Sequence, residues 1–441
     1  MKPQLRVVDE NGTVYDLARR IGRGGQGEVW LAVGGRRIVK LLANTPNADA
    51  YRKQFAAVRR MDLRELHVAK PIAVLRPPHI GYVAEFLGDM VPLRILVEAP
   101  VDGLAQWHIA TGGLRRRLRL LAHAGEALHG LHARGIIYGD VSHNNVFVSE
   151  PAHADESWLI DLDNLSTDSD PTRAIYTPGY GAPEIVTGRA GCTSLSDAWG
   201  FAVLVWQTLT LGHPFVGDLV ANGPPEMETK AFQAAVPWVG SLSDASNACS
   251  TGLPKEVVVA PRLMKLATKT FERSSHDRTN RPGVATWVED LHGCADQTIA
   301  CRKCRGSYYC NLGACPWCDE PAPGLERIRI LHWDPDKGLV QGVSGAQQLP
   351  LGSDVLVLTQ RHLFGVAGVR GRKPVAELRL VERGIAVASM PGVQIWLAKA
   401  SAPGERTEAT ERGRIVPTRG WLLFVSPRDE AQRVVELGAS A

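Results

Sequence analysis

The order in which hydrophobic periodicity changes along residues 1–292 constrains the fold of this chain more than any other feature. Short strand-like runs joined by glycine turns occupy residues 7–8, 14–17, 28–33 and 37–42. Farther along, apolar residues recur at the spacing of one helix face between Leu114 and His132, and a second helix is predicted over 196–211. The chain is therefore predicted to fold into a small sheet lobe followed by a larger helical lobe.

Composition narrows the class of protein. The chain has 441 residues, of which 44% are hydrophobic and 22% charged, and its net charge is +4 at pH 7. These values exclude a disordered or collagen-like chain and argue against a dedicated nucleic-acid binder. No apolar stretch approaches the ~18 residues that a membrane span needs. The N-terminus lacks the apolar core of a secretory signal, so we expect a soluble, cytoplasmic protein.

A glycine-rich turn opens the sheet lobe. Gly22, Gly24, Gly27 and Val29 fit the pattern GxGxxGxV, in which glycines let the backbone lie close to phosphates. A dinucleotide-binding fold would begin a helix at the last glycine, but the residues that follow are strand-like, which excludes that interpretation. Lys40 comes in the next strand, where its charge can neutralise phosphates. A solvated lysine at a strand end is the alternative.

Three polar side chains follow the helical run at a defined spacing. Asp140 and Asn145 lie five residues apart, and Asp161 follows a short apolar run. At this point the chain resembles the eukaryotic-like protein kinase family, whose catalytic loop and metal-binding motif have this order. The resemblance implies ATP as the phosphate donor and Mg²⁺ (or Mn²⁺) as the cofactor. It further implies that Asp140 accepts the substrate hydroxyl proton, that Asn145 and Asp161 hold the metal, and that Lys40 contacts the phosphates.

The resemblance covers about residues 15–292 and implies an α+β bilobal kinase fold whose lobes meet near residues 84–92. In the segment 81–87, which resembles the hinge strand between the lobes, Ala84 is expected to be a small gatekeeper. Backbone groups of Glu85 and Leu87 are expected to hydrogen-bond adenine there.

Motifs farther along occur in the family's order. Thr177 precedes an A-P-E element that ends in Glu184, and its position implies transfer to Ser or Thr hydroxyls. Asp197 lies where family members have a structural aspartate in a buried helix. Arg281 matches the late arginine that pairs with the glutamate of A-P-E.

The catalytic loop departs from the family pattern at two places. Tyr138-Gly139 replaces His-Arg, so the arginine that receives an activation-loop phosphate is missing, as in kinases that are active without loop phosphorylation. Ser142 stands where a lysine neutralises the transferred phosphate, and only His143 nearby offers partial charge. Both changes affect the expected activity more than the expected fold.

Two further positions depart from the family pattern. Asp163 replaces the glycine after the metal-binding aspartate and is interpreted as a turn residue rather than a second metal ligand. The helix expected around residues 50–60 contains no acidic partner for Lys40, although Gln54 lies near the expected place.

Two functions remain: an active but unconventional Ser/Thr protein kinase in a signalling or stress system, or a pseudokinase scaffold that recruits partners. The complete set of metal and hydroxyl ligands favours the kinase.

Two Cys-x-x-Cys pairs lie in the segment 293–320. Four thiolates at this spacing make a tetrahedral site suited to Zn²⁺, and the pairs predict a zinc ribbon. Cys294 and Cys310 are interpreted as ordinary small residues, and three basic residues are too few for a nucleic-acid-binding ribbon. The ribbon resembles the tails of some bacterial eukaryotic-like serine/threonine protein kinases, which implies a PP2C-type phosphatase and a von Willebrand A protein as partners. The predicted ligands are Cys301, Cys304, Cys315 and Cys318.

Residues 326–441 are predicted to form a small all-β domain, for which we expect a β-sandwich, after a linker at 321–324. The segments 351–353 and 360–363 faintly resemble forkhead-associated domains, but Gly352 is not followed by the expected arginine, so phosphopeptide binding is not predicted.

The basic run 115–119 is interpreted as a solvated helix face rather than a patch for an acidic partner. Candidate autophosphorylation sites in the activation segment are Ser166, Thr167, Ser169 and Thr172.

Overall fold

The computed structural model describes residues 5–24, 27–43, 46–167, 174–273, 277–340, 347–352 and 354–438. Their contacts divide the chain into two compact units. The second unit combines the cysteine-rich segment and the C-terminal region with two short segments from earlier in the chain. The first unit comprises the described residues of Met1–Ala99, Leu120–Gly252 and Pro261–Val288, and the second those of Pro100–Arg119, Leu253–Ala260 and Glu289–Ala441.

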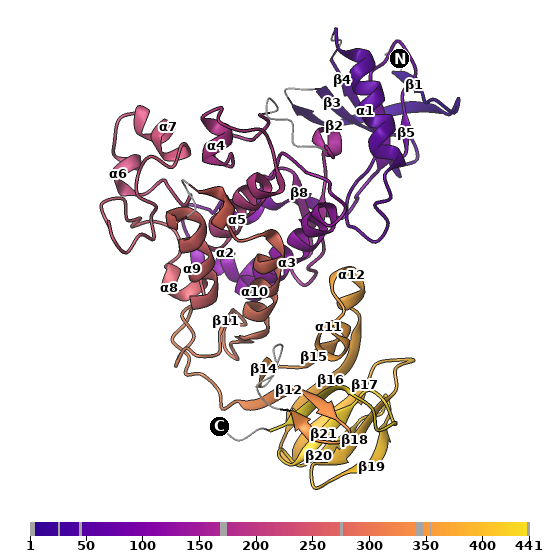
Figure 1. Cartoon of the computed structure of the whole chain (residues 1–441), viewed down its shortest axis with the longest axis vertical. Helices are drawn as coiled ribbons and strands as arrows, with labels where there is room; N and C mark the ends of the chain where they lie inside the picture. Colours follow the sequence, from indigo (N-terminus) through magenta and orange to yellow (C-terminus); the bar gives the residue numbers. More distant parts are fainter. Residues whose placement is uncertain are drawn as a thin grey trace. The chain divides into compact units, whose positions relative to one another are not determined.

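A six-stranded antiparallel sheet of order β1-β2-β3-β4-β6-β5 begins the first unit, with helix α1 (Ala48–Arg60) packed against it (Figure 1). Side chains alternate between its faces: Val39 and Val83 belong to one core cluster, whereas Tyr82 packs with Phe55 of α1 in another. The four predicted strands are confirmed, and the second of them extends to Gly24. The strands are β1 (Arg6–Val8), β2 (Val14–Gly24), β3 (Gly27–Ala32), β4 (Arg37–Leu42), β5 (Ala73–Val74) and β6 (Gly81–Glu85).

Helices make up most of the rest of the first unit. Both predicted long helices are confirmed as α3 (Gly113–His132) and α5 (Ser194–Thr210), and α5 is buried over almost its whole length. A capping box fixes the start of α5, because Thr193 and Ser196 exchange side-chain to backbone hydrogen bonds. Among the residues described, no helix is both long and apolar enough to cross a membrane. The other elements are β7 (Met90–Pro92), η1 (Leu93–Leu96), β8 (Val146–Ser149), β9 (Ser157–Leu159), η2 (Leu162–Asn164), α4 (Pro183–Val186), α6 (Asp218–Ala221), α7 (Glu226–Phe232), α9 (Pro261–Thr268), η3 (Lys269–Arg273), η4 (Arg278–Asn280) and α10 (Val284–Asp296), which continues into the second unit.

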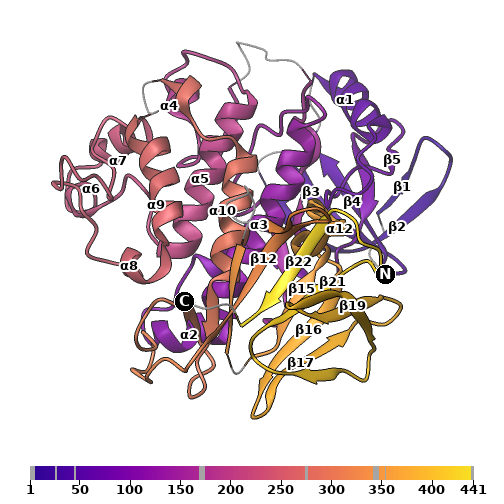
Figure 2. The same ribbon diagram turned by 60° about the horizontal axis from the view of Figure 1, so that its bottom comes forward.

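Two antiparallel sheets form the C-terminal part of the second unit (Figure 2). One has the order β13-β12-β22-β21-β18-β19, with β14 also paired to β12, and the other has the order β15-β16-β17-β20. Their inner faces share one core, to which Ile330 and Leu397 contribute from the first sheet and Leu378 and Val387 from the second. The predicted all-β region is thereby confirmed. Its strands are β12 (Glu326–Asp334), β13 (Gly338–Val340), β14 (Gln347–Leu351), β15 (Leu356–Thr359), β16 (Pro374–Val381), β17 (Gly384–Ser389), β18 (Ile395–Lys399), β19 (Ala402–Ala409), β20 (Arg414–Val416), β21 (Trp421–Phe424) and β22 (Gln432–Leu437).

Most of the basic run at the start of α3 is covered within the second unit: Arg116 and Arg117 are buried and Arg115 is half-buried. Only Arg119 is exposed, so the predicted solvated face is wrong for the other three arginines. Arg115 donates to the hydroxyl of Thr298 at 2.7 Å and to its carbonyl at 2.6 Å. Arg117 is fully buried over the ring of Trp107, and burial lowers its pKa to about 9. Segments nearly 200 residues apart in sequence cover this turn of helix, which a local pattern of charges does not reveal.

A buried ion pair joins the end of α10 to the short helix α11 (Gln360–Phe364) in the same unit. The Asp296 carboxylate accepts hydrogen bonds from Arg361 at 2.7 and 2.8 Å and lies 3.3 Å from His362. Arg361 and His362 belong to the second of the two segments behind the forkhead-associated resemblance, and both side chains contact Asp296. The remaining short elements of this unit are α2 (Leu104–Ala110), α8 (Lys255–Val258), β10 (Thr298–Ala300), β11 (Ser307–Tyr309) and α12 (Gly368–Gly371).

Candidate functional site

The glycine-rich segment forms the turn end of a β-hairpin between β2 and β3. Gly22 pairs with Val29 and Gly24 with Gly27, so a strand follows the glycines as predicted. A Cβ atom on Gly27 would lie 2.1 Å from the carbonyl oxygen of Leu41 in β4. Glycine is therefore required at this position by the close approach of two strands, whatever the hairpin binds.

Lys40 lies in β4 and its ammonium group contacts two carboxylates. It pairs with Asp161, and the Nζ–Oδ2 distance to Asp163 is 2.5 Å. Burial alone would lower the pKa of Lys40, but the charges of Asp163 and Asp161 outweigh it and raise that pKa. Lys40 is therefore a charged, positioned group rather than the solvated strand-end lysine of the alternative interpretation.

The role of Asp163 was missed by sequence reasoning. Asp163 is buried in η2, and its side chain is 2% exposed against 30% for Asp161, so it is not a simple turn residue. Gln54 of α1 instead donates to the carbonyl of Leu165 at 2.5 Å. The only signal for Asp163 was an acidic residue two positions after Asp161, in a family position that ordinarily holds glycine.

The catalytic-loop residues form one hydrogen-bonded group. Asn145 Nδ2 donates to the Asp140 carboxylate at 2.9 Å, and the Thr177 hydroxyl donates to its other oxygen at 2.7 Å. Burial raises the pKa of Asp140, and the two hydrogen bonds oppose that rise. A half-buried carboxylate held in this way can accept a proton from a hydroxyl group.

The position usually held by a lysine contributes no charge. The Ser142 hydroxyl is buried and has no hydrogen-bond partner among the described residues. His143, the nearby residue expected to offer partial charge, contacts the hydroxyl of Tyr180, which in turn donates to Gln207. Burial lowers the pKa of His143, which favours its neutral form.

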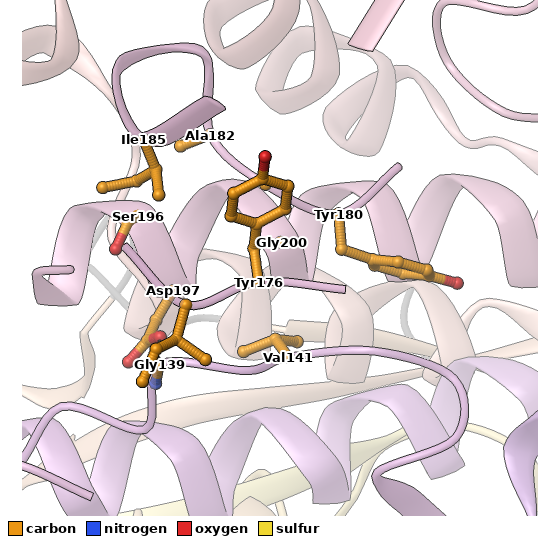
Figure 3. A pocket seen from close by; sticks show the side chains of 11 residues that line it. Gly139, Val141, Tyr176, Tyr180, Ala182, Ile185, Ser196, Asp197 and Gly200 are labelled. Carbon is orange, nitrogen blue, oxygen red and sulfur yellow. The ribbon is translucent and has the colours of Figure 1, made fainter. Parts of the chain in front are cut away.

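Asp197 of α5 holds the start of the catalytic loop, and its side chain points at Gly139 (Figure 3). Its carboxylate accepts from the backbone N–H groups of Tyr138 and Gly139, each at 2.8 Å, and lies 2.9 Å from His132 Nε2. The hollow beside it, shown in Figure 3, lies between the catalytic loop, the activation segment and α5. Its cavity volume is about 10 Å³, room for about one water molecule, and neither Lys40 nor Asp161 lines it, so the hollow is not a nucleotide site.

Replacing Asp197 with asparagine is expected to lower the free energy of unfolding by about 1.5–3 kcal/mol, because an amide group would then face buried N–H donors. The measurement is urea denaturation of the full chain. Asp62→Asn is the control: this side chain is 61% exposed, and its replacement is expected to change stability by less than about 0.5 kcal/mol. Equal urea midpoints for Asp197→Asn and Asp62→Asn would contradict the role of Asp197 in holding the catalytic-loop backbone.

The expected pair between Glu184 and Arg281 is present. Two guanidinium nitrogens of Arg281 contact the two carboxylate oxygens of Glu184 at 2.9 and 3.1 Å. The Arg281 side chain is fully buried and its Cζ lies 4.9 Å from the centre of the Trp199 ring of α5. This bidentate contact ties the end of the activation segment to the helical core.

The segment 81–87 consists of strand β6, which is paired on both sides, and the loop that follows it. Ala84 is buried and pairs with Ile38 of β4, and Glu85 is exposed beside Arg37. The Leu87 carbonyl accepts a hydrogen bond from the Met90 backbone at 3.3 Å.

Of the candidate phosphorylation sites, Ser166 pairs with Ile137 in an isolated bridge, whereas Ser169 and Thr172 lie outside the described residues.

The four predicted zinc ligands converge on one point in the second unit. All four Sγ atoms lie within 4.8 Å of one another, and the Cys301–Cys318 and Cys304–Cys315 Sγ distances are both 3.6 Å. Tetrahedral zinc with Zn–S bonds of about 2.3 Å requires S···S distances of about 3.8 Å, whereas a disulfide requires about 2.05 Å. The donor set and its spacing therefore fit Zn²⁺.

Both Cys-x-x-Cys turns have the same backbone form. The residue after each pair, Arg305 or Asp319, adopts a positive φ of 65° or 59°. Burial disfavours ionisation of the Cys301 thiol, but backbone N–H groups of Cys304 and Lys303 point at its sulfur and lower its pKa to about 7. Cys310 packs beside the cluster without joining it, and the Cys294 thiol is also separate.

Comparison with known proteins agrees with this geometry. Residues 15–286 match the family model described as the protein kinase domain. The chain is 25% identical over 339 residues to the serine/threonine-protein kinase pkn2 of Myxococcus xanthus, covering 74% of this chain and 36% of that protein. It is 25% identical over 349 residues to protein kinase YegI of Escherichia coli, covering 72% and 50%. The chain thus spans at most half the length of these two relatives. Because the family model covers more than half of it, the chain belongs to the protein kinase domain family.

Proposed function

We propose that this chain transfers the γ-phosphate of ATP to Ser or Thr hydroxyls of protein substrates. One observation carries the proposal: four polar groups up to 121 residues apart in sequence form two hydrogen-bonded pairs in the first unit, Lys40 with Asp161 and Asn145 with Asp140. The pairs are close enough for the charge of Asp161 to raise the pKa of Asp140. Phosphoryl transfer depends on positioning and on stabilising charge, and these four groups supply both.

Each of these residues has a distinct role in the proposed reaction. Asp140 accepts the hydroxyl proton of the substrate, and its orientation is fixed by Asn145 and Thr177. Lys40 contacts the nucleotide phosphates beneath the β2–β3 hairpin. The Asp161 carboxylate and the Asn145 side-chain oxygen are hard ligands suited to Mg²⁺, which when bound neutralises charge on the phosphates. The backbone of residues 85–87 is proposed to hold adenine.

We also propose that the cysteine cluster holds a structural Zn²⁺ ion, since four thiolates leave no open position for chemistry. From the family resemblance we further propose a PP2C-type phosphatase and a von Willebrand A protein as partners.

One observation favours a second candidate function. Ser142 and a neutral His143 leave the transferred phosphate without the usual lysine, as expected of a pseudokinase that binds nucleotide and recruits partners. The retained Asp140, Asn145 and Asp161 weigh against this candidate.

The test is incubation of the purified full chain with radiolabelled ATP, Mg²⁺ and a Ser/Thr-rich acceptor protein, followed by phosphoamino-acid analysis. We expect label on phosphoserine or phosphothreonine and its loss in Asp161→Asn. Nucleotide binding without transfer by the unmodified chain would support the pseudokinase. Transfer that is unaffected by Asp161→Asn would refute the assigned site.

A further inference from the structure

The two carboxylates on Lys40 differ in how firmly they are held. Asp163 is buried on all sides, with 2% of its side chain exposed, whereas the Asp161 side chain is 30% exposed. Tyr82 of β6 closes the same cluster: burial raises the pKa of its hydroxyl well above the ordinary value, and the charges of Asp163 and Asp161 add to that rise. Asp163 therefore cannot turn toward solvent without leaving a buried lysine behind.

Helix α1 supplies no acidic group to this cluster. Asp49 is its only acidic residue, and the side chain of Asp49 is 89% exposed and pairs with Arg52 one turn along the helix. Gln54 is the α1 residue nearest the expected position, and its side-chain amide donates a hydrogen bond to the carbonyl of Leu165, just after η2. The ion pair that orients the lysine of other kinases through this helix has no counterpart among the described residues of α1.

We propose that Asp163 is the positioning residue of Lys40 and replaces an acidic residue of α1. Lys40 and Asp163 remain paired when Asp161, the more exposed partner, turns to the metal. Because Asp163 belongs to the segment that follows the catalytic loop, Lys40 needs no acidic side chain of α1 for its orientation. Control through making and breaking an ion pair between that helix and the lysine, as in other kinases, is therefore absent here. Gly139 agrees with this, because no arginine at that position can receive a loop phosphate.

A double-mutant cycle on the full chain tests the pairing, with Lys40→Met, Asp163→Asn and the double variant. The inference rests on the proposed function for its kinetic measurement, which is kcat/KM for ATP. We expect Asp163→Asn to lower kcat/KM up to about 100-fold, as for a misplaced positioning group. If Asp163 acts only through Lys40, kcat/KM of the double variant equals that of Lys40→Met alone. If the losses of kcat/KM in the two single variants instead multiply in the double variant, the proposal is overturned.

Two further measurements separate the alternatives. The Mg²⁺ concentration for half-maximal rate is expected to be unchanged in Asp163→Asn, and an increase would make Asp163 a metal ligand instead. Gln54→Ala is the matched control from α1, and it is expected to keep kcat/KM within about 3-fold of the unmodified chain if the helix does not orient Lys40. A loss as large as that of Asp163→Asn would overturn the inference.

The same cycle measured by thermal unfolding without nucleotide does not depend on kinase activity. We expect the melting temperatures of the two single variants to be non-additive, since each removes the same buried contact. Non-additive melting in a chain that transfers no phosphate would refute the proposed function alone. Additive melting together with normal phosphate transfer would refute the pairing alone.

Discussion

Replacing Asp140 with asparagine is expected to lower kcat for phosphate transfer by about 10²–10⁴-fold, the usual contribution of a positioned general base. The change removes the proton acceptor but not the fold around it. An asparagine side chain keeps an oxygen for the hydrogen bond from Asn145 or from Thr177, which lie 2.9 and 2.7 Å from the carboxylate oxygens. The affinity for ATP is expected to change little, because Asp140 faces the acceptor hydroxyl rather than the nucleotide.

The measurement combines steady-state kinetics with nucleotide binding. Asp49→Asn serves as the control, since it makes the same chemical change at an exposed position of α1 and is expected to leave kcat unaltered. A melting temperature of Asp140→Asn close to that of the unmodified chain excludes unfolding as the cause. If kcat survived in Asp140→Asn, the proton acceptor would have to be another group.

The catalytic loop could be predicted from the sequence because the contacts that define it join residues close together in the chain. Asp140 and Asn145 are five residues apart in one loop, so their spacing alone brings an amide onto a carboxylate, and the hydrogen bond between them is present. The same holds for the cysteine pairs, where each Cys-x-x-Cys turn is a complete structural unit. The contact between Glu184 and Arg281 spans 97 residues but follows from motif order within the family.

The partner of Lys40 could not be predicted in this way. Asp163 is 123 residues from Lys40 in sequence, and its burial depends on η2 and on Tyr82 of β6. In isolation, an acidic residue after Asp161 is as compatible with an exposed turn as with a buried ion pair. The prediction of a solvated face for the arginines at the start of α3 was wrong for the same physical reason. A charged run indicates solvent only where no distant segment covers it, and Thr298 covers Arg115 here.

Replacing Cys301 or Cys315 with serine is expected to abolish zinc binding and to unfold the two cysteine turns. Apparent binding free energies of about 10–16 kcal/mol for structural zinc make the metal the main source of stability in so small a segment. The turns pack on α2 in the second unit: the Trp317 ring lies 4.5 Å from that of His108, and a Cβ on Gly306 would lie 2.6 Å from Trp317. Loss of the metal is therefore expected to release Trp317 from α2 and to let the backbone between the first two ligands unfold, where Arg302 and Lys303 are already exposed.

Metal content per chain and limited trypsin digestion measure these two effects separately. The unmodified chain is expected to hold about one zinc ion and to resist cleavage at Arg302 and Lys303, whereas Cys301→Ser holds none and is cut there. Cys310→Ser is the matched control, because Cys310 packs against the cluster without belonging to it. Retention of zinc by Cys301→Ser, or equal loss from Cys310→Ser, would contradict the assigned ligands. A chain that carries two disulfides would contradict the site itself, since Sγ distances of 3.6 Å fit a bridging metal and not a covalent S–S bond.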